Sequence, residues 1–497
     1  MNYTRQYVSH AASTVATAIV TGALFYVLRI VLAHYLTFDQ YGLFYAVFSF
    51  AAVFQPLLSF GFDPGLTPFV TRYRELHQPS RIRNLLFSAL IPQLAVAAIF
   101  VALIYAVAPV LSAKYFGNTQ AVSLLHWMAV HAAVLVFFKA GHQLLNGLQS
   151  VGARNLSECV RVVACLGVAG ALVRSGQGAS AAALAYVAGA AAGVLAQGVA
   201  AAVLHPRIVF ARPRWESSLV GEAFQSGKYL SWAFSGLLLF SHLDTLLLTA
   251  LLRDLNEVAA YQIAVPTWMI VQSLLIAASL SFMPMAKTLW LRGEHARLAN
   301  GLTTIYHVAV IVLLPGGMIL GSFSDVLIGM LFRRDTGSAP LAFYVLSVGA
   351  LPFFAAYFNL HVLAGIGREK AAAVAVTLGL LVNVLLNLAL VPEFGVRGAA
   401  AGTVMGYAVA AWIGYAAVMR NMSARLSSNL MAASLVVTLI VDMSCRWVRQ
   451  SHWFEMHPAA TAAAAGAVLL VASLTVLDRI SGGTLVSTCR QLRSKTG

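Results

Sequence analysis

Long apolar stretches, separated by short polar segments, follow one another along the whole chain. A helix needs about 20 mostly apolar residues to cross the hydrocarbon core of a bilayer. The first stretch is too long for the apolar region of a cleaved signal peptide, so we expect it to remain as a helix. The pattern predicts an all-α polytopic membrane protein with about 14 transmembrane helices, centred near residues 25, 53, 97, 131, 166, 191, 241, 271, 311, 352, 382, 409, 438 and 468.

The chain also repeats itself at an offset of about 216 residues. This offset contains six of the predicted helices, an even number, so the two repeats have the same orientation in the membrane. We therefore expect two pseudo-symmetric six-helix bundles, as in carriers whose substrate site lies between their halves. The matching segments are 41–44 with 258–261, the stretches after Pro68 and after Pro284, 144–154 with 361–368, and Gly178-Ala179 with Gly398-Ala399. The predicted parts are an N-terminal bundle (1–204), a cytoplasmic linker (205–228), a C-terminal bundle (229–420), and two extra helices with a basic cytoplasmic tail (421–497).

Composition supports a membrane protein and explains the net charge. Hydrophobic residues make up 60% of the chain and charged residues 10%, against about 25% charged residues in soluble domains. Of the 32 Lys and Arg residues, we assign 22 to the loops on the side of the N-terminus and eight to the opposite side, with Arg29 and Arg161 inside helices. This bias predicts that both termini are cytoplasmic. The charge of +15 therefore indicates topology and attraction to anionic lipids rather than nucleic acid.

The sequence contains no motif for energy-coupled or catalytic chemistry. No GxxxxGK[ST] loop for nucleotide phosphates occurs, and the four cysteines have no metal-binding spacing. A polysaccharide polymerase or ligase would need a large periplasmic loop with an acid/base pair, which the outer segment SDVLIGMLFRRDTGSAP does not supply. We therefore predict a carrier that is not an enzyme and has no cofactor or metal site. An ion gradient or consumption of the product would drive it.

Three stretches resemble a known family: LTFDQYGLFYAV (36–47), FGFDPGLTPFVTRY (60–73) and LLVNVLLNLALVPEFGVRGAAAGTVMGY (380–407). They are similar to polysaccharide transporters, the oligosaccharide or O-antigen flippases of the MOP flippase superfamily, which also contains MATE antiporters and lipid II flippases. The resemblance covers the whole chain. It implies two six-helix bundles around a central cavity and transport of undecaprenyl-diphosphate-linked oligosaccharide from the cytoplasmic to the periplasmic leaflet. It also implies the bacterial inner membrane as the location.

Basic residues inside or beside helices are the predicted contacts for such a diphosphate, because arginine binds phosphate with a planar fork that stays charged. Arg29 stands inside the first apolar stretch, where charge costs several kcal/mol and is usually functional. Its alternative is snorkelling toward the outer interface. Arg161 follows Glu158 by three residues, so a simple ion pair is its alternative. Arg154 and Lys139 are predicted at the inner entrance, where solvated loop positions explain them equally well.

Asp244 is the predicted coupling residue. It lies within LLLFSHLDTLLLTALL, and aspartate is too short to snorkel. The repeat brings it near the depth of Arg29, so we expect the two side chains to face each other, with Asp244 taking up a proton or sodium ion when substrate displaces it from Arg29. A fixed pair that only holds the bundle together is the alternative.

Asn383 and Asn387 belong to the most specific part of the resemblance and lie four residues apart, on one helix face. We expect them to hydrogen-bond to a neighbouring helix, with sugar contact as the alternative. Pro392, Gly395 and Gly398 predict a tight turn.

Two other carriers remain as alternatives: a lipid II-type peptidoglycan-precursor flippase, and a MATE-type cation-coupled exporter, which would need acidic rather than basic residues in its cavity. A structural or assembly protein would leave the buried charges without a purpose. The expected partners are the lipid-linked substrate and membrane lipids, together with a polysaccharide polymerase and a chain-length regulator that only the family implies. No nucleic acid is expected, and a monomer is sufficient.

Overall fold

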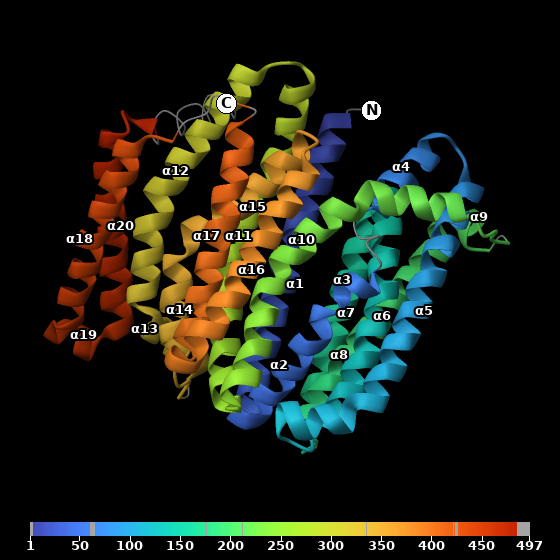
Figure 1. Cartoon of the computed structure of the whole chain (residues 1–497), viewed down its shortest axis with the longest axis horizontal. Coiled ribbons are helices and arrows are strands. Elements are labelled where there is room, and N and C mark those ends of the chain that lie inside the picture. Colours follow the sequence, from blue (N-terminus) through green and yellow to red (C-terminus); the bar gives the residue numbers. More distant parts are fainter. Residues whose placement is uncertain are drawn as a thin grey trace. The chain divides into compact units, whose positions relative to one another are not determined.

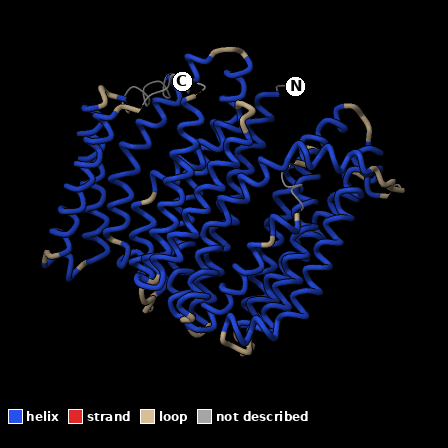
Figure 2. Tube along the Cα trace, viewed as in Figure 1, coloured by secondary structure: helices blue, strands red, loops and turns tan. Residues whose placement is uncertain are grey.

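The structure of the protein is a computed structural model. It describes residues 3–59, 65–173, 176–210, 212–333, 335–420, 422 and 426–484, and the side chains of 3–12, 173, 226, 278, 280 and 281 are not described. Residues 60–64, which open the second stretch of the resemblance, and most of the predicted basic tail (485–497) lie outside the described residues. The described chain forms helices joined by short connections, without strands (Figure 2).

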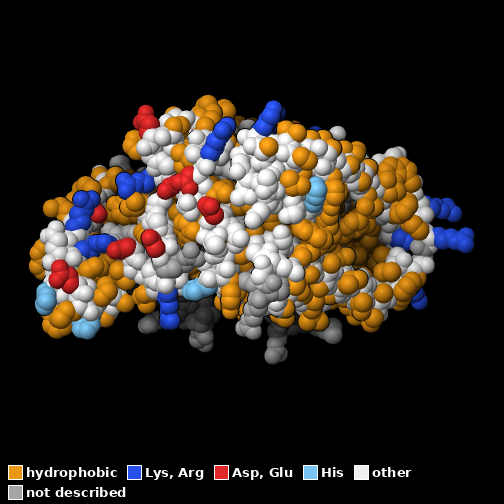
Figure 3. All heavy atoms as spheres, turned by 90° about the horizontal axis from the view of Figure 1, so that it is seen from below, with side chains coloured by type: hydrophobic (Ala, Val, Ile, Leu, Met, Phe, Trp, Pro, Cys, Tyr) orange, Lys and Arg blue, Asp and Glu red, His pale blue; other side chains and the backbone are white. Residues whose placement is uncertain are grey.

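Thirteen helices in the described chain are long and apolar enough to cross a membrane. A bent pair, α14 (Ala339–Val348) and α15 (Ala350–Gly365), adds a fourteenth span with a bend of 54°. Each span lies close to a predicted centre, so the prediction of an all-α polytopic membrane protein is confirmed. Hydrophobic side chains accordingly cover large areas between scattered charged groups in the space-filling view (Figure 3).

The chain divides into two compact units, Met1–Ala259 and Ala260–Gly497. The helices of the first unit are shown from blue to green in Figure 1. They are α1 (Tyr3–Tyr35), α2 (Phe38–Val53), α3 (Gln55–Leu58), α4 (Leu66–Glu75), α5 (Pro79–Leu111), the π-helical turn η1 (Ser112–Phe116), α6 (Ala121–Gly147), α7 (Val151–Val173), α8 (Ala179–Leu204), α9 (Pro206–Val209) and α10 (Ser217–Leu252). Helix α11 (Leu255–Leu291) begins in this unit and continues into the second.

The second unit contains the bent pair and the C-terminal helices. Its elements after α11 are α12 (His295–Ser322), α13 (Ser324–Phe332), α14, α15, α16 (Glu369–Phe394), α17 (Val396–Met419), α18 (Ser428–Arg449), α19 (His452–Met456) and α20 (Pro458–Ile480). Helices α18 and α20, which have no counterpart in the repeat, pack on α12 through a small apolar cluster around Phe323 and Val441. The Arg449 guanidinium also donates two hydrogen bonds of 2.7 Å to Asp325 of α13.

Local sequence signals explain where the helices begin and break. The Thr37 hydroxyl caps α2 by accepting a hydrogen bond from the Gln40 amide, and Ser427 caps α18 in the same way. Proline stands in the first turn of α3, α5 and α20, where its missing N–H costs nothing. Pro56 at the start of α3 coincides with the break after α2.

The backbone carries the internal repeat more clearly than the sequence does. Residues with positive φ occur in pairs about 217 residues apart: His77 with Gly293, Gly117 with Arg333, Gln149 with Gly367, and Gly178 with Gly395. The last pair shares one conformation, with φ 56° and ψ −138° at Gly178 and φ 56° and ψ −132° at Gly395. The sequence alone pairs Gly178 with Gly398. The backbone conformation instead pairs Gly178 with Gly395. Each of these residues precedes a helix, α8 or α17, in a turn whose positive φ favours glycine.

Candidate functional site

Arg29 extends from α1 onto an aromatic surface formed by α2. Its guanidinium carbon lies 4.1 Å from the centre of the Tyr45 ring, and Tyr41 and Tyr186 are close enough to interact with it. Tyr41 and Tyr45 are fully buried, and their ring centres are 4.7 Å apart. A cation held on an aromatic face gains about 2 kcal/mol when desolvated, so this surface compensates part of the cost of a charge at membrane depth.

A second layer of rings and imidazoles surrounds this arginine. The Phe48 ring lies 5.3 Å from Tyr186, 6.2 Å from His131 and 6.1 Å from His242, measured between ring centres. His131 Nδ1 is 3.1 Å from the Tyr186 carbonyl oxygen, and His242 Nδ1 is 3.3 Å from the Ser49 hydroxyl. Helices α2, α6, α8 and α10 therefore meet around Phe48.

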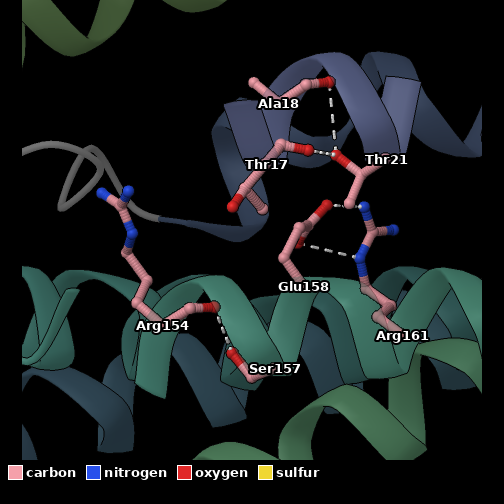
Figure 4. A network of polar contacts seen from close by, with 7 residues as sticks. All are labelled: Thr17, Ala18, Thr21, Arg154, Ser157, Glu158 and Arg161. Carbon is pink, nitrogen blue, oxygen red and sulfur yellow. Dashed lines mark hydrogen bonds and ion pairs between the residues drawn. The ribbon is translucent and has the colours of Figure 1, made fainter. Parts of the chain in front are cut away.

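Arg161 of α7 forms the ion pair with Glu158 that their spacing predicts. Its Nε donates to Glu158 Oε2 over 3.2 Å, and both side chains point from α7 toward α1 (Figure 4). The guanidinium carbon also lies 4.6 Å from the Phe25 ring centre and 5.1 Å from that of Phe138. Phe25 is itself 6.3 Å from Tyr186. Arg29 and Arg161 thus share one aromatic network within the first unit, which we call the arginine–aromatic site.

Arg154 occupies a different environment. Its side chain is nearly buried, at 8% exposure, and it joins three helices. Its Nη1 donates to Asn146 Oδ1 over 3.0 Å, while Nη2 donates to Thr14 Oγ1 over 2.6 Å and to Asn155 Oδ1 over 2.9 Å. These neutral partners engage the guanidinium as a cross-link between α1, α6 and α7. Arg154 is therefore not at a solvated loop edge.

Lys139 also lies within a helix rather than in a loop. It is half-buried in α6, well before that helix ends at Gly147. The assignment of this lysine to an inner loop was wrong, because the fourth apolar stretch extends further toward the C-terminus than its centre near residue 131 suggested. Its role in binding substrate stays a prediction.

Asp244 is fully buried in α10, within the span Gly227–Leu252. Helix α10 packs against α2, and His242, two residues before Asp244, is close enough to Arg29 for their charges to interact. The same stretch of α10 therefore reaches the surroundings of Arg29.

Asn383 and Asn387 are fully buried between α16 and α17 in the second unit. Asn387 Nδ2 donates to the Asn383 carbonyl oxygen over 2.8 Å. A Cβ on Gly402 of α17 would lie 2.7 Å from the same Nδ2 atom, so the asparagine occupies the space that this glycine leaves. This hydrogen bond lies within α16, so the expected hydrogen bond to a neighbouring helix and the alternative of sugar contact stay predictions.

Sequence reasoning missed the aromatic partners of the two arginines. Tyr41 and Tyr45 are spaced for one helix face, as are Phe44 and Phe48, and this run was the available signal. Tyr186, Phe25 and Phe138 come from other helices, so only the fold brings them to the site.

Among the described helices α1 to α17, the charged side chains in the middle of the spans lie in the first unit, whereas α18 and α20 of the second unit carry Asp442 and the buried Asp478. Arg29, Lys139, Arg154, Glu158, Arg161 and Asp244 lie in the spans of the first unit, whereas the central parts of α11, α12 and α14 to α17 contain no Asp, Glu, Lys or Arg. The uncharged stretches are 260–286, 298–323, 341–367, 371–392 and 398–419. A site that recognises charge therefore belongs to the first unit.

Comparison with solved structures shows the fold class. The lipid II flippase MurJ in an inward closed conformation matches with a TM-score of 0.70 and 14% identity over 95% of this chain and 99% of that chain. A MOP superfamily transporter from Pyrococcus furiosus, described as having a binding pocket of reverse polarity, matches with a TM-score of 0.59 and 17% identity over 84% and 96% of the two chains. An inward-facing multidrug resistance MATE transporter gives 0.58 and 15% over 80% and 98%. The fold is that of a MOP superfamily transporter.

Sequence comparison narrows the class to a family. An uncharacterised membrane protein of Methanocaldococcus jannaschii is 25% identical over 437 residues, which are 83% of this chain and 84% of that protein. The model of the polysaccharide biosynthesis protein family matches residues 8–290, more than half of the chain. The chain belongs to this family, and it is a multi-pass membrane protein with the fold of the transporters above.

Proposed function

We propose that this protein is a flippase that moves undecaprenyl-diphosphate-linked oligosaccharide, the repeat unit of an O-antigen, capsule or exopolysaccharide, from the cytoplasmic to the periplasmic leaflet by alternating access. The observation that carries the proposal is the arginine–aromatic site. Two arginines in the interior of one unit share a single aromatic network, and the polysaccharide family match covers this unit.

The diphosphate is the group that this site would hold. Arg29 has tyrosine rings and hydroxyls around it, and Glu158 pairs with one edge of the Arg161 guanidinium, through Nε and Nη2. A diphosphate offers several oxygens to both planar forks. In a site of low dielectric, each such contact is stronger than in water. The Glu158 carboxylate would keep Arg161 oriented and would restrict entry to ligands with enough negative charge to compete with it.

Asp244 is the proposed coupling group. Its complete burial within a span of α10, the helix that packs against α2, supports this role. Protonation or cation binding at Asp244 would free Arg29 for the diphosphate, and substrate release would restore the Arg29–Asp244 interaction. The carrier would then export substrate in exchange for a proton or a sodium ion.

A lipid II-type flippase is the second candidate, because its substrate is also a lipid diphosphate and MurJ shares the fold over nearly the whole chain. A MATE-type exporter of organic cations ranks third, since two interior arginines would repel its substrate. We further propose the bacterial inner membrane as the location, cytoplasmic termini, a functional monomer, and cooperation with a polymerase and a chain-length regulator.

The deciding experiment uses a deletion strain without a redundant flippase. Its lipid-linked glycans are extracted and assigned to a leaflet by their accessibility to a periplasmic glycosidase, and surface polysaccharide is measured in parallel. A trapped undecaprenyl-diphosphate oligosaccharide on the cytoplasmic side, cleared by wild type but not by Arg29→Ala, is the expected result. Normal surface polysaccharide without any trapped intermediate would refute the proposal, and accumulation of lipid II alone would select the second candidate.

A further inference from the structure

Gln197 in α8 is a buried amide that the first unit leaves without hydrogen bonds. Its exposure is 4%, and neither Oε1 nor Nε2 has a hydrogen-bond partner among the described residues. An unsatisfied buried polar group costs about 1–3 kcal/mol. An apolar side chain of the same shape would avoid this cost, so packing alone gives no reason for a glutamine here.

The position of Gln197 connects it to the arginine–aromatic site. A Cβ on Gly193, one helical turn earlier in α8, would lie 3.0 Å from Arg161 Cβ and 2.7 Å from the Phe138 ring. Three residues after Phe138 on α6, a Cβ on Gly141 would approach Gln197 Oε1 to 2.2 Å. Four residues of helix correspond to about 6 Å, so the amide lies roughly one turn from the Arg161 backbone, in a space that Gly141 keeps open.

The repeat supplies an internal comparison. In the repeat, Gly141 of α6 corresponds to Asn359 of α15, and Gln197 of α8 corresponds to Gly414 of α17. Each unit therefore has one amide facing one glycine, but the amide is on α8 in the first unit and on α15 in the second. That amide is satisfied: Tyr306 donates to Asn359 Oδ1, and Asn359 Nδ2 donates to the Ala411 carbonyl oxygen over 2.9 Å. The residue that corresponds to Tyr306 in the first unit is Leu90, which offers no hydrogen bond. The amide is thus present in both units, but among the described residues only the second unit provides hydrogen-bond partners for it.

We propose that Gln197 recognises the sugar next to the diphosphate of the lipid-linked substrate. A primary amide both donates and accepts, so it fits a neutral group that does the same, namely a sugar hydroxyl or an acetamido group. The first sugar of such a lipid is joined directly to the diphosphate, which agrees with an amide one turn from Arg161. The inference rests on the proposed function and adds a contact that selects for the sugar rather than for the charge. Gln197 is enclosed in this conformation, so the contact forms when neighbouring side chains such as Phe138 move aside.

The test measures binding of two soluble probes to the full-length purified protein in nanodiscs. Farnesyl diphosphate carries the charge without a sugar, and a farnesyl-diphosphate-linked hexose carries both. For wild type, the hexose should tighten binding, and Gln197→Met should weaken binding of the hexose probe about 3- to 10-fold while leaving farnesyl diphosphate unchanged. Gly141→Ala, which displaces the amide without altering it, should reduce the sugar-dependent gain in the same direction.

A stability measurement separates recognition from packing. Gln197→Met should leave the thermal midpoint unchanged or raise it, because it removes unsatisfied groups. The matched variant Asn359→Leu breaks two hydrogen bonds, so it should lower the midpoint without changing the sugar-dependent gain. An equal gain from the hexose in wild type, Gln197→Met and Gly141→Ala would overturn the inference and would indicate a buried water as the partner of the amide. Failure of wild type to bind farnesyl diphosphate at all would instead overturn the proposed function.

Discussion

At the scale of single residues, the environment of Arg29 explains how a charge is kept in the interior of a membrane protein. Its guanidinium rests on Tyr45 and interacts with Tyr41 and Tyr186. A desolvated cation–π contact contributes about 2 kcal/mol, less than the several kcal/mol that a charge costs at this depth. The remaining cost would be offset by an anionic ligand.

Replacement of Arg29 therefore tests the site directly. Arg29→Met should reduce flipping of the lipid-linked oligosaccharide by at least tenfold, and Arg29→Lys should recover only part of it, because lysine keeps the charge but loses the bidentate fork. The measurement is clearance of the trapped intermediate in the deletion strain at equal protein levels. Arg297→Ala is the control, since that side chain is 74% exposed at the surface. Full recovery with lysine would show that only the charge matters.

His205 gives a prediction for pH at the same scale. It follows α8, outside the spans, and its Nε2 lies 2.8 Å from the Ser150 hydroxyl. Burial, and secondarily the charge of Arg74, lower the pKa of its imidazole below the usual 6.5. The unfolded state then binds the proton more readily, so the contribution of His205 to stability is present above about pH 6.5 and is lost as the pH falls through the folded pKa.

Thermal unfolding between pH 5 and 8 tests whether the protein loses stability as the pH falls. The midpoint of the wild type should fall more steeply below pH 6.5 than that of His205→Gln, which cannot titrate. A parallel pH dependence of the two proteins would remove His205 as a cause. The effect should be small, because the residue is only partly buried.

At the scale of helices, small residues set the distance between α7 and α8. A Cβ on Gly189 would lie 2.7 Å from the Arg161 carbonyl oxygen and 2.7 Å from Cys165 Cβ. The corresponding pair in the second unit, α16 and α17, is equally close, since a Cβ on Gly379 would lie 2.6 Å from the Gly406 carbonyl oxygen. Close backbones of this kind stabilise helix pairs in lipid, where no hydrophobic force brings them together.

Two glycines of α8 form a matched pair for testing this packing. Gly189→Ala should lower the free energy of unfolding by about 1–3 kcal/mol, because backbone atoms have to move. Gly198→Ala has nothing within 4 Å of the added carbon, so it should be neutral or stabilising through helix propensity. Thermal midpoints of the two variants in the same detergent test whether the close packing of α7 and α8 stabilises the protein. Equal midpoints would mean that the two helices can move apart at little cost.

At the scale of the whole molecule, the sequence predicted the number of spans and the repeat, because both follow from hydrophobic length and from turn residues. The arginines were predicted from the cost of charge in a bilayer. Their aromatic partners were not, since Phe25, Phe138 and Tyr186 look like ordinary core residues until the fold brings them together. Gln197 was missed for the same reason, because only a structure shows that its amide has no hydrogen-bond partner among the described side chains and backbone, while that of Asn359 does.

The two units share a backbone plan but differ in charge, and this asymmetry leads to a prediction about energy coupling. A carrier that draws energy from an ion gradient needs a group that binds the ion, and Asp244 is a fully buried carboxylate available for this route. In proteoliposomes, an imposed pH or sodium gradient should accelerate flipping by the wild type, and Asp244→Asn should abolish that acceleration while slow downhill flipping persists. Asp442→Asn, at a carboxylate paired with exposed Arg446 on α18, should respond to the gradient as the wild type does. An undiminished response of Asp244→Asn would mean that the aspartate only holds the bundle together and that product consumption drives transport.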